Sequence, residues 1–268
     1  MKKIAILGAG NMGSAVAESL KDSEYEIICT AASQRTLDRI KRNIPGVAVN
    51  LSNKEAVVGA DIVILAVKPY LSDDICNEIS DCLKEDAIVI SLMAGVSLFD
   101  LIAGLHAKSY IFENGKSLHL ARVIPNTAIK YGKSVTFIAF NDAVPENVRE
   151  EVESIFSLSG KAFVVTEGKM AACTSLASCG IAYFLRFIRA AVEGAVEIGL
   201  KPDFATEVAA LTAEGAAALL SDGSHPEAEI DKVTTPGGLT IRGLNALEAH
   251  GLNAAVIAAL KASTPCDE

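Results

Sequence analysis

The stretch "KIAILGAGNMG" (residues 3–13) decides the fold of this 268-residue chain. A short apolar run is followed by the pattern G-x-G-x-x-G and then by residues with helical spacing. In such a strand–turn–helix unit, Gly8 allows the tight turn, Gly10 lets a pyrophosphate approach the backbone, and Gly13 lets the helix pack close to the strand. The helix N-terminus offers free N–H groups to the phosphates. The stretch therefore predicts dinucleotide binding, with a plain tight turn as the alternative.

Outward from this stretch, the first 160 residues alternate between strand and helix signals. The runs 61–67 and 87–93 are continuously apolar, as is typical of strands buried on both faces of a parallel sheet. "SNKE" (52–55) predicts a helix start with a capping box, and we interpret 104–117 as a surface excursion. This rhythm predicts a doubly wound α/β sheet. Its expected strands are 3–7, 25–31, 47–49, 61–67, 87–93, 118–124, 135–140 and 161–165.

From about residue 166 onward the strand signals stop and Ala-rich helical patterns follow. These helices are apolar on more than one face, and a bundle of about a hundred residues cannot bury so much apolar surface alone. We expect an N-terminal Rossmann-type doubly wound sheet (1–163) followed by an all-α dimerisation domain (164–268). The chain is predicted to form a homo-oligomer of paired copies.

Composition limits the partners and the compartment. Half of the residues are hydrophobic and the formal net charge is −9, without a basic block, so nucleic acid is not expected as a partner. No stretch of transmembrane length is expected, and the N-terminal apolar run is too short for a signal peptide. We therefore expect a cytoplasmic protein that does not enter a membrane. No metal site is expected, and the cysteines, which form no C-x-x-C pair, are predicted to be reduced and mostly buried: Cys29, Cys76, Cys82, Cys173, Cys179 and Cys266.

The residues after the second strand indicate which dinucleotide is bound. An NAD site usually carries an Asp or Glu there to hold the ribose 2′-hydroxyl. This chain has "TAASQRT" (30–36), with Ser33 and Arg35 and no acid. A hydroxyl and a guanidinium would hold a 2′-phosphate by charge-assisted hydrogen bonds. NADPH is the predicted cofactor, with NADH as the alternative; Arg35 could also be an ordinary solvated residue.

Three strand ends carry small or turn-forming residues that would meet at one edge of the sheet. They are "AVKP" (66–69), "MAGVS" (93–97) and "IPNT" (124–127). Ligands of open α/β sheets bind at the carboxyl ends of the strands, and small side chains let a flat ring lie against backbone. Each segment alone is an ordinary loop start. Together they predict further cofactor contacts at Ala66, Val67, Lys68, Pro69, Ala94, Gly95 and Asn126.

A second candidate site lies in "TTPGG" (234–238), inside the helical half. We interpret Thr235 as a helix N-cap, Pro236 as the first helical residue, and Gly237 and Gly238 as the next two. Their N–H groups would then be free and unshielded, so an anion such as a carboxylate could dock there. The hydroxyl of Thr240 would lie about half a turn further. The alternative is a corner between helices with nothing bound.

The sequence resembles the pyrroline-5-carboxylate reductase family nearly end to end. The resemblance lies in "GAGNMG", "NKEAVVGADIVILAVKP", "AGVS", "RVIPNT" and above all "HPEAEIDKVTTPGGLTIRGLNALEAHGL". It implies NAD(P)H, a Rossmann domain and a helical domain interlocked with a second subunit. It also implies substrate contacts at Leu239 and Thr240, and cofactor contacts at Ala9, Asn11, Met12, Ser33, Asn53, Val67, Lys68 and Ala94.

The chain departs from the family pattern in three places. "SCGIAY" (178–183) replaces G-S-G-P-A-Y, Ala128 stands where a Pro usually follows P-N-T, and the excursion 104–117 is longer than expected. The first departure bears on the shape of the substrate pocket.

The reaction implied is the NADPH-dependent reduction of 1-pyrroline-5-carboxylate to L-proline. Gly237 and Gly238 would hold the substrate carboxylate, with Thr235 capping the helix. Thr240 would hydrogen bond the ring nitrogen; a hydroxyl is a poor acid, so its role is orientation. Glu167, where the domains join, is a candidate for the pocket wall.

Two other functions stay open. A β-hydroxyacid dehydrogenase shares the glycine turn and a helical second domain, but its catalytic Lys is missing from "CGIAYFLRF" (179–187). A non-catalytic NADP-binding regulator would have no need of an intact "TTPGGLT" (234–240).

Overall fold

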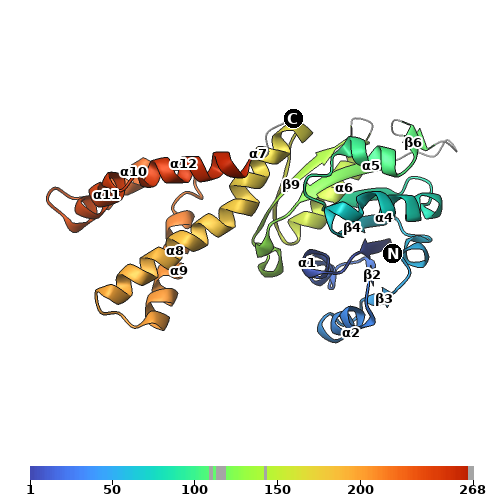
Figure 1. The fold of residues 1–268 in the computed structure, drawn as a ribbon, viewed down its shortest axis with the longest axis horizontal. Helices are drawn as coiled ribbons and strands as arrows, with labels where there is room; N and C mark the ends of the chain where they lie inside the picture. Colours follow the sequence, from blue (N-terminus) through green and yellow to red (C-terminus); the bar gives the residue numbers. More distant parts are fainter. Residues whose placement is uncertain (109–110, 113–118, 142–143, 265–268) are drawn as a thin grey trace. The chain divides into compact units, whose positions relative to one another are not determined.

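The computed structural model describes residues 1–108, 111–112, 119–141 and 144–264 (Figure 1). The chain separates into two compact units, Met1–Ser178 and Cys179–Glu268. The described strands all lie in the first unit, and the second is helical, so the predicted α/β and all-α order is confirmed. The compact units divide after Ser178 rather than after 163. The reason is that Met170, at the start of a helix, is buried in the sheet unit.

One eight-stranded sheet, in the order β10-β9-β8-β5-β4-β1-β2-β3, forms the centre of the first unit. The strands from β3 to β8 pair in parallel, as the buried apolar runs predict. β9 runs antiparallel to β8 because a short link that holds one 3₁₀ turn reverses the chain, and β10 is parallel to β9. The strands are β1 Lys3–Leu7, β2 Glu26–Thr30, β3 Ala48–Asn50, β4 Ile62–Leu65, β5 Ile88–Ser91, β8 His119–Ile124, β9 Ser134–Phe140 and β10 Gly160–Val164.

Helices cover both faces of this sheet (Figure 1). Alternate residues of β1 point to opposite faces: Ile4 and Ile6 join one buried cluster, and Ala5 and Leu7 join the other. The first cluster is shared with α1 Asn11–Leu20, α2 Gln34–Asn43 and α6 Glu146–Ser157. The second is shared with α3 Asn53–Val57, α4 Ser72–Ile79 and α5 Leu98–Gly104.

The strand order reverses between β1 and β4, which places a crevice at their carboxyl ends. β1 continues through α1 to β2 on one side, whereas β4 lies on its other side. Such a switch point is where doubly wound sheets bind their ligands.

Two predicted local features need correction. The capping box at Ser52 is half formed: its hydroxyl accepts from the backbone N–H of Glu55 at 3.3 Å, but the Glu55 carboxylate accepts from Asn50 Nδ2 at 2.9 Å instead. The predicted excursion 104–117 lies largely outside the described residues. Its described part includes a two-stranded antiparallel ladder, β6 Ala107–Lys108 and β7 Ile111–Phe112.

The cysteine prediction is correct in part. Cys29 and Cys76 are buried, and burial raises the pKa of their thiols to about 12 and about 11 respectively. Cys82, Cys173 and Cys179 are partly exposed, contrary to the expectation that most cysteines are buried. Cys266 lies outside the described residues. In the part of the chain that the structure describes, no three His, Cys, Asp or Glu side chains gather as metal ligands.

The second unit is built from helices whose apolar side chains stay largely exposed. α8 packs against α9 after a short turn, and α11 packs against α12. Phe184 is 71% exposed and Leu211 is 60% exposed. The helical elements from 170 onward are α7 Met170–Thr174, the π turn η5 Ser175–Cys179, α8 Gly180–Glu197, α9 Pro202–Ala218, α10 Pro226–Lys232, α11 Leu239–Ala249 and α12 Leu252–Ser263.

The expectation that no segment reaches transmembrane length is wrong for the helical stretch Glu167–Glu197. It has 31 residues and a mean hydropathy of 1.4 in its most apolar window, of which 11% is buried. Length and composition alone do not place a helix in a membrane, because a helix that packs against a second copy of the chain passes the same test. Arg186, Arg189 and Glu193 interrupt its far end.

Candidate functional site

The turn after β1 has the backbone that its glycines predict. Gly8 has a φ of +91°, and a Cβ atom there would lie 2.7 Å from Cγ1 of Val67. A Cβ atom at Gly13 would lie 2.6 Å from the carbonyl oxygen of Gly8, so only glycine lets α1 approach β1 this closely. A Cβ atom at Gly10 would meet nothing within 4 Å. Gly8 and Gly13 are thus needed by the protein itself, whereas Gly10 leaves open space beside the backbone.

The start of α1 is free to receive an anion. Its N-cap is Gly10, and no side chain among the described residues caps it. The first N–H groups of an α-helix have no partner within the helix. Here they belong to Asn11, Met12 and Gly13 and carry the positive end of the helix dipole.

A cleft of about 820 Å³ opens at this helix start and runs along the crevice of the sheet. Eleven of the residues predicted to bind a cofactor line it: Gly8, Ala9, Gly10, Asn11, Met12, Asn53, Ala66, Val67, Lys68, Pro69 and Ala94. Residues from "GAGNMG", "AVKP" and "MAGVS" therefore meet at one place, as their positions at strand ends predict.

Several residues that line the cleft were not predicted from the sequence. Asp74, Ile75 and Glu78 lie on one face of α4, and Leu71 is the residue just before this helix, so helical spacing offered a partial signal for this wall. Most of the rest lie at or just after the ends of β2, β3 and β5, and Thr36 lies in the first turn of α2. The missed residues are Thr30, Ala31, Ala32, Thr36, Leu51, Leu71, Asp74, Ile75, Glu78, Leu92 and Met93.

A chain of hydrogen bonds fixes Asn53 in the cleft. The hydroxyl of Thr30, at the end of β2, accepts from the N–H of Gly8 at 3.3 Å and donates to Asn53 Oδ1 at 2.6 Å. Asn53 Nδ2 donates to Glu78 Oε2 at 2.9 Å. Both the oxygen and the nitrogen of the Asn53 side-chain amide are thus hydrogen bonded, so this side chain is preorganised beside the glycine turn.

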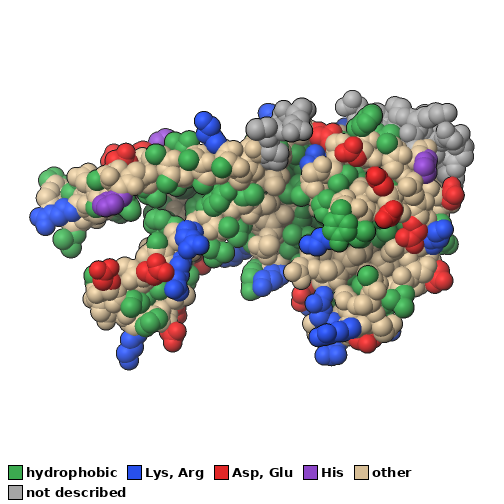
Figure 2. Space-filling view, viewed as in Figure 1, with side chains coloured by type: hydrophobic (Ala, Val, Ile, Leu, Met, Phe, Trp, Pro, Cys, Tyr) green, Lys and Arg blue, Asp and Glu red, His purple; other side chains and the backbone are tan. Residues whose placement is uncertain are grey.

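The start of α2 beside the cleft is rich in hydroxyl groups, and the helix itself is basic. Ser33 caps this helix, accepting from the N–H of Thr36 at 3.4 Å, and the two hydroxyls lie 3.0 Å apart. Thr36 lines the cleft, and Arg35 is exposed beside it. Arg39, Lys41 and Arg42 make α2 strongly basic, and basic side chains gather over α2 in Figure 2. The acid that would repel a 2′-phosphate is absent from residues 31–36.

Five predicted cofactor residues do not line the cleft: Gly13, Ser33, Arg35, Gly95 and Asn126. Gly95 forms a turn with a φ of +80°. Asn126 is 4% exposed and caps the 3₁₀ turn η3 Thr127–Tyr131, with its Oδ1 accepting from the N–H of Ala128 at 3.0 Å. These contacts within the protein hold Asn126 at the start of the turn.

The predicted helix start at "TTPGG" is wrong by three residues. Thr235 to Gly238 form a turn in which the carbonyl of Thr235 accepts from the N–H of Gly238 at 2.9 Å, and Gly237 has a φ of +70°. Pro followed by Gly at the two central positions is the sequence signature of a type II turn. α11 begins at Leu239, with Gly238 as its N-cap.

This turn gives the two glycines different roles. Gly237 supplies the left-handed backbone, whereas a Cβ atom at Gly238 would lie 2.5 Å from the hydroxyl oxygen of Thr235. The N–H of Gly238 is occupied within the turn. The free donors at this helix start are therefore the first amides of α11, those of Leu239, Thr240 and Ile241, and no side chain of the described residues caps them.

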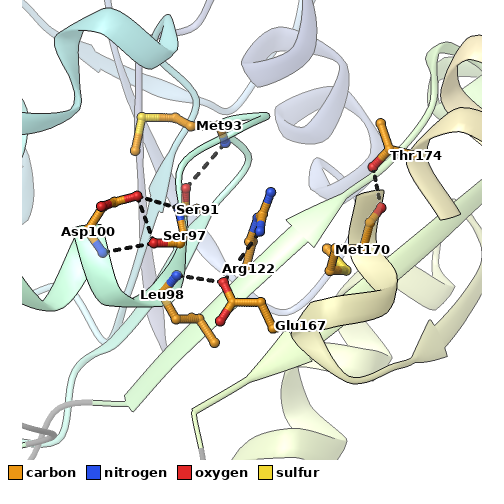
Figure 3. A network of polar contacts seen from close by, with 9 residues as sticks. All are labelled: Ser91, Met93, Ser97, Leu98, Asp100, Arg122, Glu167, Met170 and Thr174. Carbon is orange, nitrogen blue, oxygen red and sulfur yellow. Dashed lines mark hydrogen bonds and ion pairs between the residues drawn. The ribbon is translucent and has the colours of Figure 1, made fainter. Parts of the chain in front are cut away.

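Glu167 lies in a polar junction of the first unit, drawn in Figure 3. Its Oε1 accepts from the backbone N–H of Leu98 at 2.7 Å and lies 3.3 Å from Nη1 of Arg122 on β8. Next to it, Ser97 and Asp100 form a complete capping box at the start of α5. Hydrogen bonds from the Ser97 hydroxyl and backbone N–H hold the pKa of Asp100 below its usual value.

Comparison with known proteins covers nearly the whole chain. Residues 167–266 match the family model for pyrroline-5-carboxylate reductase dimerisation, and residues 3–95 match a model described as NADP oxidoreductase, coenzyme F420-dependent. Pyrroline-5-carboxylate reductase 2 of Dictyostelium discoideum is 36% identical over 272 residues, which are 96% of this chain and 89% of that relative. The chain belongs to the pyrroline-5-carboxylate reductase family.

Two further comparisons define the extent of the likeness. Pyrroline-5-carboxylate reductase 1 of Dictyostelium discoideum is 37% identical over 277 residues; the match covers 97% of this chain and 48% of the relative, so the chain spans about half of that protein. The solved pyrroline carboxylate reductase of Plasmodium falciparum, with NADP bound, has a TM-score of 0.85 at 23% identity, covering 98% of this chain and 95% of that one. At that identity the likeness establishes the fold.

Membership of the reductase family accounts for the exposed apolar helices. The dimerisation match begins at residue 167 and includes every helix from α7 to α12. The departure "SCGIAY" (178–183) begins within the π turn η5, where the helix widens before α8. π turns inside α-helices often occur at functional sites.

Proposed function

We propose that the chain reduces 1-pyrroline-5-carboxylate to L-proline with NADPH, the last step of proline biosynthesis. The observation that carries this proposal is the nearly full-length relationship to named reductases, 36% identical over 96% of the chain. The open cleft at the glycine turn and the uncapped start of α11 supply the two kinds of binding group that the reaction needs.

NADPH would lie in the cleft of the first unit and would supply the hydride. The amides at the start of α1 would receive its pyrophosphate, and Asn53 would contact the nucleotide beside the glycine turn. Ser33, Thr36 and Arg35 would hold the 2′-phosphate by charge-assisted hydrogen bonds. Lys68, Ala94, Gly95 and Asn126 stay proposed contacts toward the nicotinamide end.

The carboxylate of the substrate would dock at the start of α11. An anion there accepts from the amides of Leu239 and Thr240 and is stabilised by the helix dipole, worth about 0.3–1 kcal/mol at an exposed site. Gly237 and Gly238 shape the turn that leaves these amides uncovered, and Thr235 closes that turn. The proposed donors to the carboxylate are thus the amides of Leu239 and Thr240, in place of the expected amides of Gly237 and Gly238.

Thr240 is proposed to orient the substrate ring. Its hydroxyl can donate a hydrogen bond to the ring nitrogen, whose electron density rises during reduction. A hydroxyl is too weak an acid to supply the proton by itself, so the proton would be on the substrate already or come through water. Much of the rate enhancement would then come from proximity and orientation.

The functional assembly is proposed to be a homo-oligomer of intertwined dimers. Relationship to the dimerisation family supports a pairing of copies, and the exposed apolar side chains of α8 and α9 provide the surface. A cytoplasmic location, without a nucleic acid or membrane partner, belongs to the same proposal. The acidic net charge of −9 supports the exclusion of nucleic acid.

An assay with purified protein tests the activity. NADPH oxidation should depend on 1-pyrroline-5-carboxylate, and proline should appear in equal amount. If the protein oxidises 3-hydroxyacids with NADP⁺ but does not reduce the imine, a hydroxyacid dehydrogenase is favoured. If it binds the cofactor without any turnover, a regulator is favoured.

The substitution Thr240→Ala tests the assigned role of the hydroxyl. It should lower kcat/KM for the imine about 10- to 100-fold, the effect of one lost orienting hydrogen bond. NADPH affinity, measured by titration, should not change. A variant that loses NADPH affinity but keeps its turnover rate would contradict this assignment.

A further inference from the structure

The segment between β5 and α5 connects the cofactor cleft with the Glu167 junction. Leu92, Met93 and Ala94 line the cleft, and Leu98 begins α5 only four residues later. At its first end the segment is held by Ser91, whose hydroxyl accepts from the N–H of Met93 at 3.3 Å. The position of this wall of the cleft therefore depends on how its second end is held.

Glu167 holds that second end from 69 residues away in sequence. The Ser97–Asp100 capping box satisfies the N–H groups of those two residues. The N–H of Leu98, the first helical residue, is one of the orphan donors of α5. Glu167 Oε1 accepts it at 2.7 Å, so the carboxylate completes the cap that the local sequence leaves unfinished.

Arg122 fixes the carboxylate in turn. It lies on β8 in register with Ser91 of β5. The guanidinium is therefore anchored beside the residue from which the segment 92–97 starts. Its side chain is 13% exposed, and Glu167 is the ion-pair partner that the described residues offer it. Arg122 Nε is buried without a hydrogen-bond partner in the described part of the chain. The guanidinium is largely shielded from water while Glu167 is 34% exposed, so removal of Glu167 would leave a shielded charge without its counter-ion.

We infer that Glu167, held by Arg122, is a positioning residue for hydride transfer: through Leu98 it sets the wall Leu92–Ala94 at the cofactor cleft. Glu167 thus acts through the backbone of this segment and does not itself contact the substrate, in contrast to the expected pocket wall. The inference rests on the proposed function for its kinetic consequence, but its structural consequence does not depend on the substrate.

Single substitutions separate this role from a general loss of stability. Glu167→Ala removes both contacts and should lower the rate of hydride transfer about 10- to 100-fold, as a small misplacement does. Glu167→Gln keeps an oxygen that can accept from Leu98 and should lose less. NADPH affinity should change less than about 3-fold, because the phosphate groups bind elsewhere. Deuterium at the transferred position of NADPH should slow the variants more than the parent.

A matched control and a double-mutant cycle sharpen the test. Glu151→Ala removes another ion-paired glutamate of the same unit, the partner of Lys2 at 2.6 Å, and should leave the rate unchanged. Leu98→Pro deletes the donor at a helix position where Pro is favoured. If Glu167 acts through Leu98, the effects of Leu98→Pro and Glu167→Ala on the rate should be less than additive. Full additivity would overturn the inference.

Hydrogen exchange decides the structural part without any turnover. In the NADPH-bound protein, the amides of 92–98 should exchange faster in Glu167→Ala than in the parent and in Glu151→Ala. Unchanged exchange at 92–98 would overturn the inference whether or not the protein reduces the imine. A parent enzyme that fails to reduce the imine, with the exchange effect present, would overturn the proposed function alone.

Discussion

The sheet unit and the helical unit contain apolar residues in similar abundance but bury them very differently. In the first unit, Ile4, Ile64 and Ile90 are completely buried. In the second unit, the buried hydrophobic residues of the described part are Val192 and Ala205. Phe184 and Ile257, by contrast, are 71% and 58% exposed.

The difference shows what each unit needs in order to be stable. The sheet has helices on both faces and forms its core within one copy of the chain. In the helical unit the helices pack mainly in pairs, which leaves many apolar side chains exposed. An exposed apolar area of this extent marks a surface for association with another protein chain. The comparison therefore predicts that the first unit binds its cofactor alone, whereas the second depends on a partner copy.

The largest expected effect comes from placing a charge on the apolar face of α8. Phe184→Glu should disrupt pairing, since a charge buried without a partner costs several kcal/mol. Sedimentation should show smaller particles, and imine reduction should fall by about 100-fold or more, as expected for a loss of about 3 kcal/mol or more. NADPH binding, measured by titration, should persist because its cleft lies in the first unit.

A charge reversal on the same helix provides the control for this experiment. Arg186 is exposed, so Arg186→Glu changes charge without burying it. It should leave the particle size and the activity nearly unchanged. Equal dissociation by both variants would mean that net charge, rather than the apolar face, decides assembly.

The second prediction concerns Gly8 and Gly10 within the sheet unit. Gly8→Ala forces a Cβ atom to within 2.7 Å of Val67 at a φ of +91°, so we expect a loss of stability of about 2 kcal/mol or more. Gly10→Ala meets open space and should change stability by less than about 1 kcal/mol. Its NADPH affinity should nevertheless fall about 10-fold or more, because the methyl group would occupy the pyrophosphate position. Thermal unfolding measures the stability of the two variants, and titration measures their NADPH affinity. If Gly10→Ala and the parent bind NADPH equally well, the pyrophosphate does not bind at this turn.

The sheet and its glycine turn were predictable because their signals are local. Continuous apolar runs and glycine spacing reflect contacts within a few residues or within one layer of the sheet. For the residues of α4, helical spacing predicts a shared face, but packing between elements decides that this face lines the cleft. The antiparallel β9 was likewise not predictable from apolar content, since strand direction follows from the length of the link.

The error at "TTPGG" has a specific physical cause. Pro is favoured both at the first helical position and at the second position of a type II turn, so Pro236 fitted both descriptions. Gly237 decides between them, since its φ of +70° belongs to the turn. Glu167 was placed near the domain junction, but its bond to Leu98 links residues far apart in sequence. No local pattern encodes such a contact.

The third prediction sharpens the claim that the first unit alone selects the cofactor. Arg35→Ala should raise the Kd of NADPH about 10-fold, which corresponds to one lost charge-assisted contact to phosphate. The Kd of NADH should stay within about 2-fold, since NADH lacks that phosphate. Arg39→Ala removes a positive charge one turn further along the same helix, away from the Ser33 cap, and serves as the control. An equal loss of affinity for NADPH and NADH would show that Arg35 does not contact the 2′-phosphate.

The smallest expected effect compares a serine–aspartate pair in each unit. Hydrogen bonds from Ser97 lower the pKa of Asp100, and hydrogen bonds from Ser224 lower the pKa of Asp222. A carboxyl whose folded pKa is depressed adds stability above its unfolded pKa of about 3.9 and loses it as the pH falls through the folded value.

Only the pair in the sheet unit completes a helix cap, at the start of α5. Asp100→Asn should therefore lower the unfolding free energy by about 0.5 kcal/mol at neutral pH, and the difference from the parent should shrink as the pH falls through the lowered pKa of Asp100. Asp222 is in an exposed loop of the helical unit, where water screens its hydrogen bonds, so Asp222→Asn should produce a smaller loss with the same sign of pH dependence. Denaturant titrations at neutral and acidic pH test this. An equal, pH-dependent loss in both variants would show that the loop of the helical unit is held as firmly as the cap of α5, contrary to the difference between the units.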